Sequence, residues 1–338
     1  MMLERRVAPS FADPFPVYRD LAETLLTAHL RVPLERDSTV AHVLATCAGY
    51  AYADAETVST MMARLGLFGH GCVRISQVVD SMFIYSTAYL LQSRCGRVVI
   101  VCYRGTEPGE LLNWLGDVDV GPESSKLLVA EGLTELRVHG GFHRNLRATW
   151  WPVLDELGAA LAGKSLADRR QSVPGPLEAI YVCGHSLGGA MALLFMLKLA
   201  GDVQQRALAE RVRALYTFGQ PMTVLLPVSP TLVESQRSVF RHVLPEDPVP
   251  ALPAGSWGPF VHLGHEYRWV EGEWRRSAVP VEQLPTMRQV PRIVLSLLDR
   301  SERRKSGRYS FAAHGPQHYL SALRPGDRVT EFGDRDAL

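Results

Sequence analysis

Three features are scarce in this sequence of 338 residues: long apolar runs, an excess of either charge, and paired cysteines. The best apolar run, Ala190 to Leu197, ends at Lys198, well short of the ~18 residues that a membrane-spanning helix needs. The 36 Lys and Arg residues and 35 Asp and Glu residues leave a net charge of +1, which offers no electrostatic basis for binding nucleic acid. We therefore expect no transmembrane segment and no nucleic-acid partner.

Cysteine usage and the N-terminal segment bear on cellular location. The five cysteines are odd in number, lie mostly in apolar runs and include no Cys-x-x-Cys pair, which favours buried free thiols over a disulfide framework. Pro9, Pro14 and Pro16 stand where a secretory signal would need an apolar stretch. These features favour a cytoplasmic location and leave export after removal of a leader open.

Composition and periodicity indicate one large α/β domain. With 46% hydrophobic residues the chain can bury a large core, and we assign residues 1–338 to a single domain. Residues 1–70 are expected to be a helical part packed on the sheet, because helical periodicity precedes the first strand pattern. Strand and helix patterns then alternate, which favours a mostly parallel central sheet flanked by helices. The expected strands are 73–79, 82–91, 97–103, 179–183, 212–218 and 239–244, and the expected helices are 18–30, 39–52, 56–65, 143–161 and 187–200.

The segment Gly184-His185-Ser186-Leu187-Gly188 places a serine between two glycines where a strand pattern gives way to a helix pattern. A sharp turn in this context raises a serine hydroxyl out of the fold, where a base can take its proton. The two glycines are expected to face each other too closely for side chains. Ser186 is therefore the candidate nucleophile, and the main-chain N–H of Leu187, at the helix start, is a candidate oxyanion donor.

An acid that orients a histidine is expected downstream of the serine, as in α/β-hydrolase folds. Asp247 follows a buried strand pattern and lies among the prolines Pro245, Pro248 and Pro250. Parallel sheets collect functional residues at this end of their strands, so Asp247 is the candidate acid. Glu246 is the rival carboxylate, although its neighbouring position directs its side chain elsewhere.

Two histidines near the end of the sequence are candidate bases. His314 precedes a Gly-Pro pair and is expected on a loop that reaches the serine. His318 is expected in the first turn of the terminal helix and is the alternative base. His262 and His265 form a His-x-x-His pair, but no third ligand lies nearby in the sequence, so we interpret both as structural and expect no metal site.

These motifs resemble those of the class 3 lipases, an α/β-hydrolase family that includes fungal triacylglycerol lipases and bacterial and plant esterases. The resemblance implies an α/β-hydrolase fold with Ser186, Asp247 and His314 as the catalytic triad. In relatives the histidine commonly precedes a tyrosine by a few residues, which favours His314 over His318. The sequence departs from the family pattern at Glu246, where asparagine is usual. The matching pieces are Tyr103-Arg104-Gly105-Thr106, Asn113-Trp114-Leu115-Gly116-Asp117, Val138-His139-Gly140-Gly141-Phe142, Gly184 to Ala190, Phe218-Gly219-Gln220-Pro221, Asp247-Pro248-Val249-Pro250 and His314 through Tyr319-Leu320.

The resemblance also implies a second oxyanion donor and a lid. Thr106, the residue after Arg-Gly, would supply the second donor. Residues 107–114 correspond to a short amphipathic helix that covers the site in water and meets a lipid–water interface on opening, and the alternative is a surface helix packed permanently on the core. A cap insertion over residues 274–308 is a further expectation. The lid residues are Glu107, Leu111, Leu112 and Trp114.

The implied activity is the hydrolysis of carboxylic esters of lipids, as in a triacylglycerol lipase, through an acyl-enzyme. No step requires a metal or an organic cofactor, and the expected partner is a lipid or small ester substrate. A short-chain carboxylesterase or a phospholipase is the alternative, because chain-length preference depends on pocket walls. A non-catalytic hydrolase-like binding protein would keep the fold, but it has no reason to retain Ser186, Asp247 and His314 together.

Overall fold

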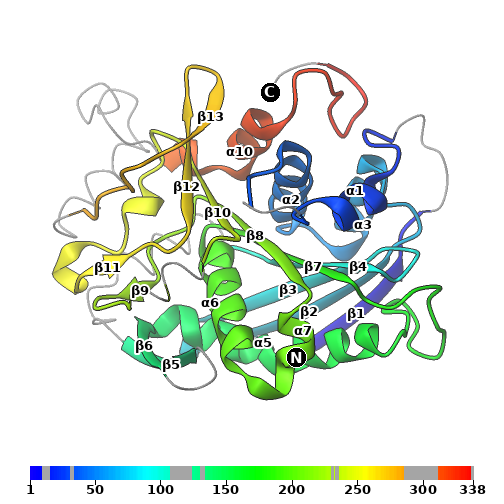
Figure 1. Cartoon of the computed structure of the whole chain (residues 1–338), viewed down its shortest axis with the longest axis horizontal. Coiled ribbons are helices and arrows are strands. Elements are labelled where there is room, and N and C mark those ends of the chain that lie inside the picture. The colour runs from blue at the N-terminus through cyan, green and yellow to red at the C-terminus, as the bar shows by residue number, and fades with distance from the viewer. Residues whose placement is uncertain are drawn as a thin grey trace.

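The computed structural model describes residues 1–9, 16–30, 34–106, 124–129, 134–229, 232, 236–284 and 311–335. A nine-stranded sheet forms its centre (Figure 1). In spatial order the strands are β1 (Met2–Val7), β2 (Gly71–Val79), β3 (Ile84–Gln92), β4 (Val98–Tyr103), β7 (Ala179–His185), β8 (Val212–Phe218), β10 (Val239–Val243), β12 (His265–Val270) and β13 (Glu273–Arg276).

The strands from β4 to β12 in this order run parallel to one another, and β1, β2, β3 and β13 add antiparallel edges. The predicted mostly parallel central sheet is therefore confirmed. All six residues of β4 are buried, as its continuous apolar run predicts for a strand covered on both faces. The carboxyl ends of the parallel strands lie together at the left-hand side of Figure 1.

Helices cover both faces of the sheet, so the molecule has three layers (Figure 1). One face packs against α5 (Gly140–Leu161), α6 (Leu187–Gly201) and the short α7 (Arg206–Ala209). The other face packs against α1 (Leu21–Thr27), α2 (Ser38–Tyr50), α3 (Ala55–Leu65) and α10 (Pro316–Leu323). Alternation along β7 serves both cores, because Ile180 and Val182 point to the first and Tyr181 and Cys183 to the second.

Side-chain caps explain where two of the predicted helices begin. Asp37 accepts a 2.9 Å hydrogen bond from the Val40 N–H at the start of α2. Asp54 accepts one of 2.8 Å from the Thr57 N–H at the start of α3. Each carboxylate satisfies a main-chain donor that the first turn of a helix leaves free.

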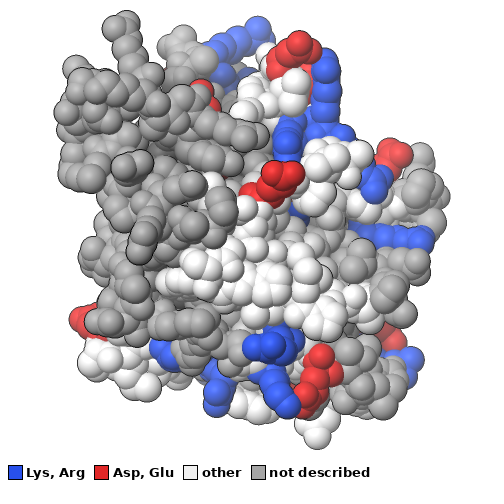
Figure 2. All heavy atoms as spheres, turned by 90° about the vertical axis from the view of Figure 1, so that its left-hand side faces the viewer, with Lys and Arg blue, Asp and Glu red and all other residues white. Residues whose placement is uncertain are grey.

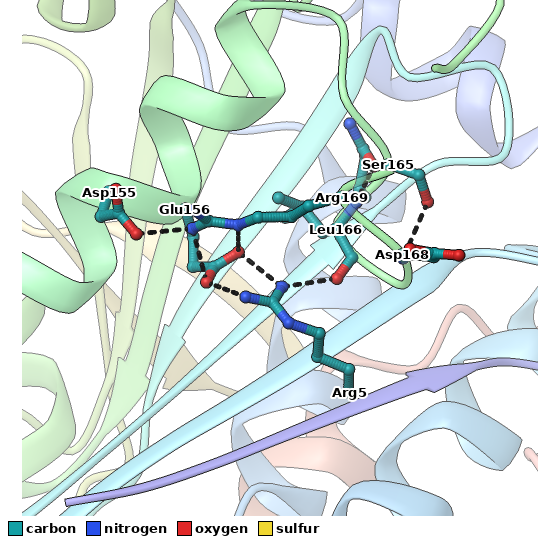
Figure 3. A network of polar contacts seen from close by, with 8 residues as sticks. Arg5, Asp155, Glu156, Ser165, Leu166, Asp168 and Arg169 are labelled. Carbon is teal, nitrogen blue, oxygen red and sulfur yellow. Dashed lines mark hydrogen bonds and ion pairs between the residues drawn. The ribbon is translucent and has the colours of Figure 1, made fainter. Parts of the chain in front are cut away.

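Strand β1 corrects the prediction that residues 1–70 are helical. It pairs antiparallel with β2 at one edge of the sheet. Arg5 on β1 donates hydrogen bonds of 2.5 and 2.7 Å to the carboxylate of Glu156 on α5 and one of 2.7 Å to the Leu166 carbonyl. Figure 3 shows Arg5 and Arg169 converging on Glu156, whose side chain is only 1% exposed. This buried carboxylate fixes the edge strand to a helix far along the chain.

A second, four-stranded sheet, which the sequence did not predict, lies near the carboxyl ends of the parallel strands (Figure 1). Its spatial order is β11 (Phe260–Val261), β9 (Val224–Leu225), β6 (Thr134–His139) and β5 (Ser124–Val129). Strand β6 leads directly into α5. Of the predicted cap over residues 274–308, the beginning belongs to β13 and its following loop, and residues 285–310 lie outside the described residues.

Within the described ranges no single helix is long and apolar enough to cross a bilayer, although one pair, Leu187–Gly201 with Val203–Ala209, passes the same length and composition test with a 94° bend between its members. The five cysteines are free thiols, and all but Cys95 are buried.

Candidate active site

Ser186 occupies a tight turn between β7, which ends at His185, and α6, which begins at Leu187. Its backbone has φ 57° and ψ −130°, a left-handed region that non-glycine residues rarely adopt and that costs roughly 1–3 kcal/mol. Two hydrogen bonds hold this conformation. The Ser186 N–H donates to the Phe218 carbonyl at 2.9 Å, and the Ser186 carbonyl accepts from the Gly189 N–H at 2.9 Å.

The two flanking glycines permit this turn, though in different ways. A Cβ on Gly184 would overlap the main chain of Gly188, as predicted from the spacing. A Cβ on Gly188 would instead overlap the Tyr103 carbonyl at the end of β4. The prediction that each glycine leaves room for the other is therefore right for Gly184. Gly188 instead lets the first turn of α6 approach the end of β4.

Asp247 and His314 are joined by a hydrogen bond, although 67 residues separate them in the sequence. The His314 Nδ1–H donates to Asp247 Oδ2 at 2.8 Å, and both side chains are buried. The rivals lie elsewhere, since the side chains of Glu246 and His318 are exposed. Asp247 follows the end of β10, and His314 ends a 3₁₀ turn (Phe311–His314) just before α10.

The carboxylate of Asp247 is saturated with donors. Tyr319 on α10 donates its hydroxyl to Oδ2 at 2.6 Å, and the Val249 N–H donates to Oδ1 at 2.9 Å. Burial, with the neighbouring Asp247 charge, holds the pKa of Tyr319 well above its usual value, so the phenol remains a donor. These bonds fix the carboxylate and, through it, the tautomer of His314 that leaves Nε2 without a proton.

Gly219 explains how the serine and the acid–histidine pair come together. Its φ is +59°, and a Cβ at this position would lie 2.7 Å from Asp247 Oδ2 and 2.9 Å from His314 Cε1. Ser186 is bonded to the residue before it, Phe218. Phe218 and Gly219, at the end of β8, therefore contact all three candidate residues.

Two polar atoms of this site remain open. Ser186 Oγ and His314 Nε2 are buried and have no hydrogen-bond partner in the part of the chain that the structure describes. A serine hydroxyl and an unprotonated imidazole nitrogen are the groups that a nucleophile and its base require, and such bonds often tighten only when substrate binds.

The candidate oxyanion donors follow the ends of two neighbouring parallel strands, β7 and β4. Leu187 is the first residue of α6, so its N–H has no acceptor within the helix and lies at the positive end of the helix dipole. Thr106 follows the end of β4 and is buried at 8% exposure. The lid candidates Glu107, Leu111, Leu112 and Trp114 lie outside the described residues.

His262 and His265, the pair considered for metal binding, each have a hydrogen-bond partner within the protein. His262 Nε2–H donates to the Pro250 carbonyl at 2.8 Å, whereas His265 Nδ1 accepts from Arg276 at 2.8 Å. The sulfur atoms of three core cysteines lie within 4.8 Å of one another. Burial raises the pKa of two of these thiols, Cys102 and Cys183, and an apolar core surrounds the group, which suits protonated thiols rather than thiolate ligands. The three cysteines are Cys47, Cys102 and Cys183.

The end of the sheet that holds these groups faces the viewer in Figure 2. The described part of this face carries a broad uncharged band, with Lys and Arg side chains above and below it.

The chain is similar to known lipases in sequence and in fold. Residues 100–257 match the family described as "Lipase (class 3)". This segment is therefore similar to the class 3 lipases. It is 32% identical over 194 residues to a lipase of Rhizomucor miehei, a match that covers 56% of this chain and 47% of that protein. It is 29% identical over 199 residues to the triacylglycerol lipase OBL1 of Arabidopsis thaliana, covering 52% and 37%. The match thus spans less than half the length of these relatives.

Solved lipase structures share the fold of this chain. A lipase from Rhizopus microsporus var. chinensis aligns with a TM-score of 0.50 and 17% identity over 91% of this chain and 93% of that one. A Rhizomucor miehei lipase in complex with its propeptide aligns with a TM-score of 0.50 and 18% identity over 84% and 79%. The predicted α/β-hydrolase fold is confirmed.

Two residues of the site, Tyr319 and Gly219, were not predicted from the sequence. Tyr319 served only as a landmark for the histidine, although a tyrosine at a fixed distance after a candidate base is itself a signal for a bond to the acid. Gly219 was part of a matching piece, but a glycine directly after a buried strand does not reveal which side chains will lie against it.

Proposed function

We propose that the protein is a serine hydrolase that cleaves carboxylic esters of lipids, triacylglycerols foremost. The observation that carries this proposal is the 2.8 Å bond from His314 Nδ1 to Asp247 Oδ2, together with the buried His314 Nε2 and Ser186 Oγ atoms, which have no hydrogen-bond partner among the described residues. The match of residues 100–257 to the class 3 lipase family supports the choice of ester bonds over other acyl groups.

The first half of the reaction transfers the acyl group to the serine. His314 Nε2 takes the proton of Ser186 Oγ as the oxygen attacks the ester carbonyl carbon. The carbonyl oxygen becomes an oxyanion, which the main-chain N–H groups of Leu187 and Thr106 stabilise. The C–O bond to the alcohol then breaks, and the leaving alcohol takes the proton from His314.

The second half releases the acid. Water gives a proton to His314 Nε2 and attacks the acyl-enzyme, and the collapse of the second oxyanion returns that proton to Ser186 Oγ. Asp247 stabilises the imidazolium in both halves because its carboxylate is buried and held in place. The loss of one oxyanion donor in such a site typically slows the reaction by about 100- to 1,000-fold.

The lipid substrate and the lid are the finer part of the proposal. The sequence of residues 107–114 is amphipathic, and a helix of that kind would present Leu111, Leu112 and Trp114 to an apolar surface. Activity that rises steeply once a triacylglycerol exceeds its solubility would support a lid that opens at an interface. Activity that follows one hyperbola through the solubility limit would contradict it.

The direct test is steady-state hydrolysis of aryl esters with increasing acyl length, by the purified chain and its Ser186→Ala variant. We expect the wild type to be active with a preference for long acyl chains and Ser186→Ala to be inactive. A preference for short chains would favour a carboxylesterase, and equal inactivity of both proteins on every ester would overturn the proposal. His314→Ala and His318→Ala form a matched pair, of which only the first is expected to abolish activity, because His318 is exposed.

A further inference from the structure

His185, the last residue of β7 and the neighbour of Ser186, is hydrogen-bonded at both ring nitrogens. Nε2 lies 2.7 Å from the main-chain carbonyl oxygen of His314, and Nδ1 lies 2.8 Å from the Tyr52 hydroxyl. A carbonyl oxygen can only accept, so Nε2 carries the proton. Nδ1 is therefore an acceptor, and the Tyr52 hydroxyl donates to it.

The surroundings of His185 keep it in this neutral form. The residue is 2% exposed, and its ring centroid lies 4.5 Å from that of His314 and 5.7 Å from that of Tyr319. Burial, together with the neighbouring His314, lowers the pKa of His185 well below its usual value. A neutral imidazole with a fixed tautomer gives a bond of constant direction to the His314 carbonyl.

We propose that His185 is a positioning residue for His314, fixing the main chain of the residue whose imidazole serves as the base. This inference rests on the proposed function of the site. The His314 side chain is anchored through Nδ1 to Asp247, and its main chain is anchored through the carbonyl to His185. Two anchors on one residue fix both the place and the direction of Nε2, and the strand that carries the second anchor presents Ser186 as its next residue.

Tyr52 extends the same arrangement to the oxyanion side. It lies two residues beyond α2, and a Cβ on Gly105 would overlap its hydroxyl and lie 2.7 Å from the His185 carbonyl oxygen. Gly105 is the residue before Thr106. The Tyr52–His185 pair therefore packs between the strand end that leads to the oxyanion donor and the turn that carries the base.

If His185 and Tyr52 served only to fill space, their ring nitrogens and hydroxyl would not be needed. A buried imidazole and a buried phenol lose hydration, which an apolar residue of similar volume avoids. The pairing of both His185 nitrogens offsets that loss only in the arrangement that holds His314. An apolar residue in place of His185 would therefore leave a folded protein in which His314 is misplaced. Glutamine at the same position would retain a donor for the His314 carbonyl and an acceptor for the Tyr52 hydroxyl.

The test compares His185→Leu with His185→Gln in the full chain, on a short water-soluble aryl ester. We expect His185→Leu to lower kcat by about 100-fold with little change in KM, since a misplacement of about 1 Å costs that much. His185→Gln is expected to recover most of the loss. The rate at which an aryl phosphonate labels Ser186 should follow the same order, because that reaction needs the base but not the binding of a lipid chain.

His70→Leu is the matched control. His70 is another fully buried histidine whose Nδ1–H donates to a main-chain carbonyl, that of Leu67, at 2.6 Å, and it precedes β2 at the opposite end of the sheet. We expect this variant to lose stability and to keep kcat per folded molecule.

Three results would overturn the inference: a folded His185→Leu variant with wild-type kcat, a glutamine variant no better than leucine, or a leucine variant whose loss lies in KM alone. If His185→Leu does not fold, the Tyr52→Phe variant tests the inference instead. It should lower kcat by about tenfold, because His185 loses one of its two hydrogen-bond partners. An unchanged kcat in Tyr52→Phe would then count against the proposal. Failure of the proposed function is distinct, because it appears in the comparison of wild type with Ser186→Ala before any His185 variant is made.

Discussion

The hydroxyl of Tyr319 donates a 2.6 Å hydrogen bond to Oδ2 of Asp247, across 72 residues of sequence. Hydrogen bonds to charged groups contribute about 1.5–3 kcal/mol, so we expect Tyr319→Phe to lower the free energy of unfolding by that amount. Unfolding in urea measures it, with an unchanged m-value as the sign that only stability has changed. Tyr267→Phe, in a half-buried tyrosine of β12 whose hydroxyl bonds to no other described residue, is the control. Equal losses in the two variants would contradict the role assigned to Tyr319.

Gly219→Ala tests whether the close packing of Gly219 against Asp247 and His314 is needed for activity. The added methyl group would press on Asp247 Oδ2 and His314 Cε1, and the backbone has a positive φ of +59°. We expect kcat/KM to fall by at least ~100-fold, as for other small misplacements of reacting groups. Gly272→Ala separates the two causes, because Gly272 has φ +83° but open space around its Cβ position. If the two variants lose activity equally, contact with the acid and histidine is not the reason.

Stability is expected to fall in mild acid. Burial lowers the pKa of His42 and His70 to about 4 and that of His139 to about 3. An unfolded histidine titrates near 6.5, so below this pH the unfolded chain binds protons that the folded chain does not. The stabilisation is complete above about pH 6.5 and is lost as the pH falls toward 4, by up to roughly 3 kcal/mol per histidine.

Urea unfolding between pH 7.5 and pH 4.5 checks this prediction through the slope of the unfolding free energy against pH. His70→Gln keeps a donor for the Leu67 carbonyl and should reduce the slope by up to one proton. A free energy of unfolding that stays constant down to pH 5 would show that the buried histidines do not control acid stability.

Long periodic segments made most of the fold predictable. The apolar run of β4 and the helix-forming run of α6 carry their structure in their own residues. Strand β1 does not, because its Glu-Arg-Arg centre suits a strand only at a sheet edge and with Glu156 as a distant partner. Strands β9 and β11 have two residues each, too few to show any period.

The candidate site divides in the same way. Ser186 stands in a contiguous motif, and Asp247 and His314 stand beside turn residues that mark loops. The bond from Tyr319 to Asp247 and the contacts of Gly219 arise only when α10, β8 and β10 meet, so nothing within one segment indicates them.

Glu156→Gln tests the attachment of the edge strand. Glu156 is 1% exposed between Arg5 and Arg169, and breaking such a buried group is expected to cost about 3 kcal/mol. The pair Arg97–Glu178, at 37% and 39% exposure, is screened by solvent and should contribute much less, which makes Glu178→Gln the control. Thermal and urea unfolding measure both, and similar losses would contradict the importance of burial.

The contacts of Arg5 also set an order of assembly. Arg5 is synthesised 151 residues before Glu156 and 161 before Leu166, so the chain must grow through α5 and the following loop before this arginine can find its partners. Contacts of such large sequence separation form late because the entropy of loop closure must be overcome first. On the ribosome, β1 is therefore made well before the partners of Arg5 exist, and until they do this arginine is open to chaperones and proteases.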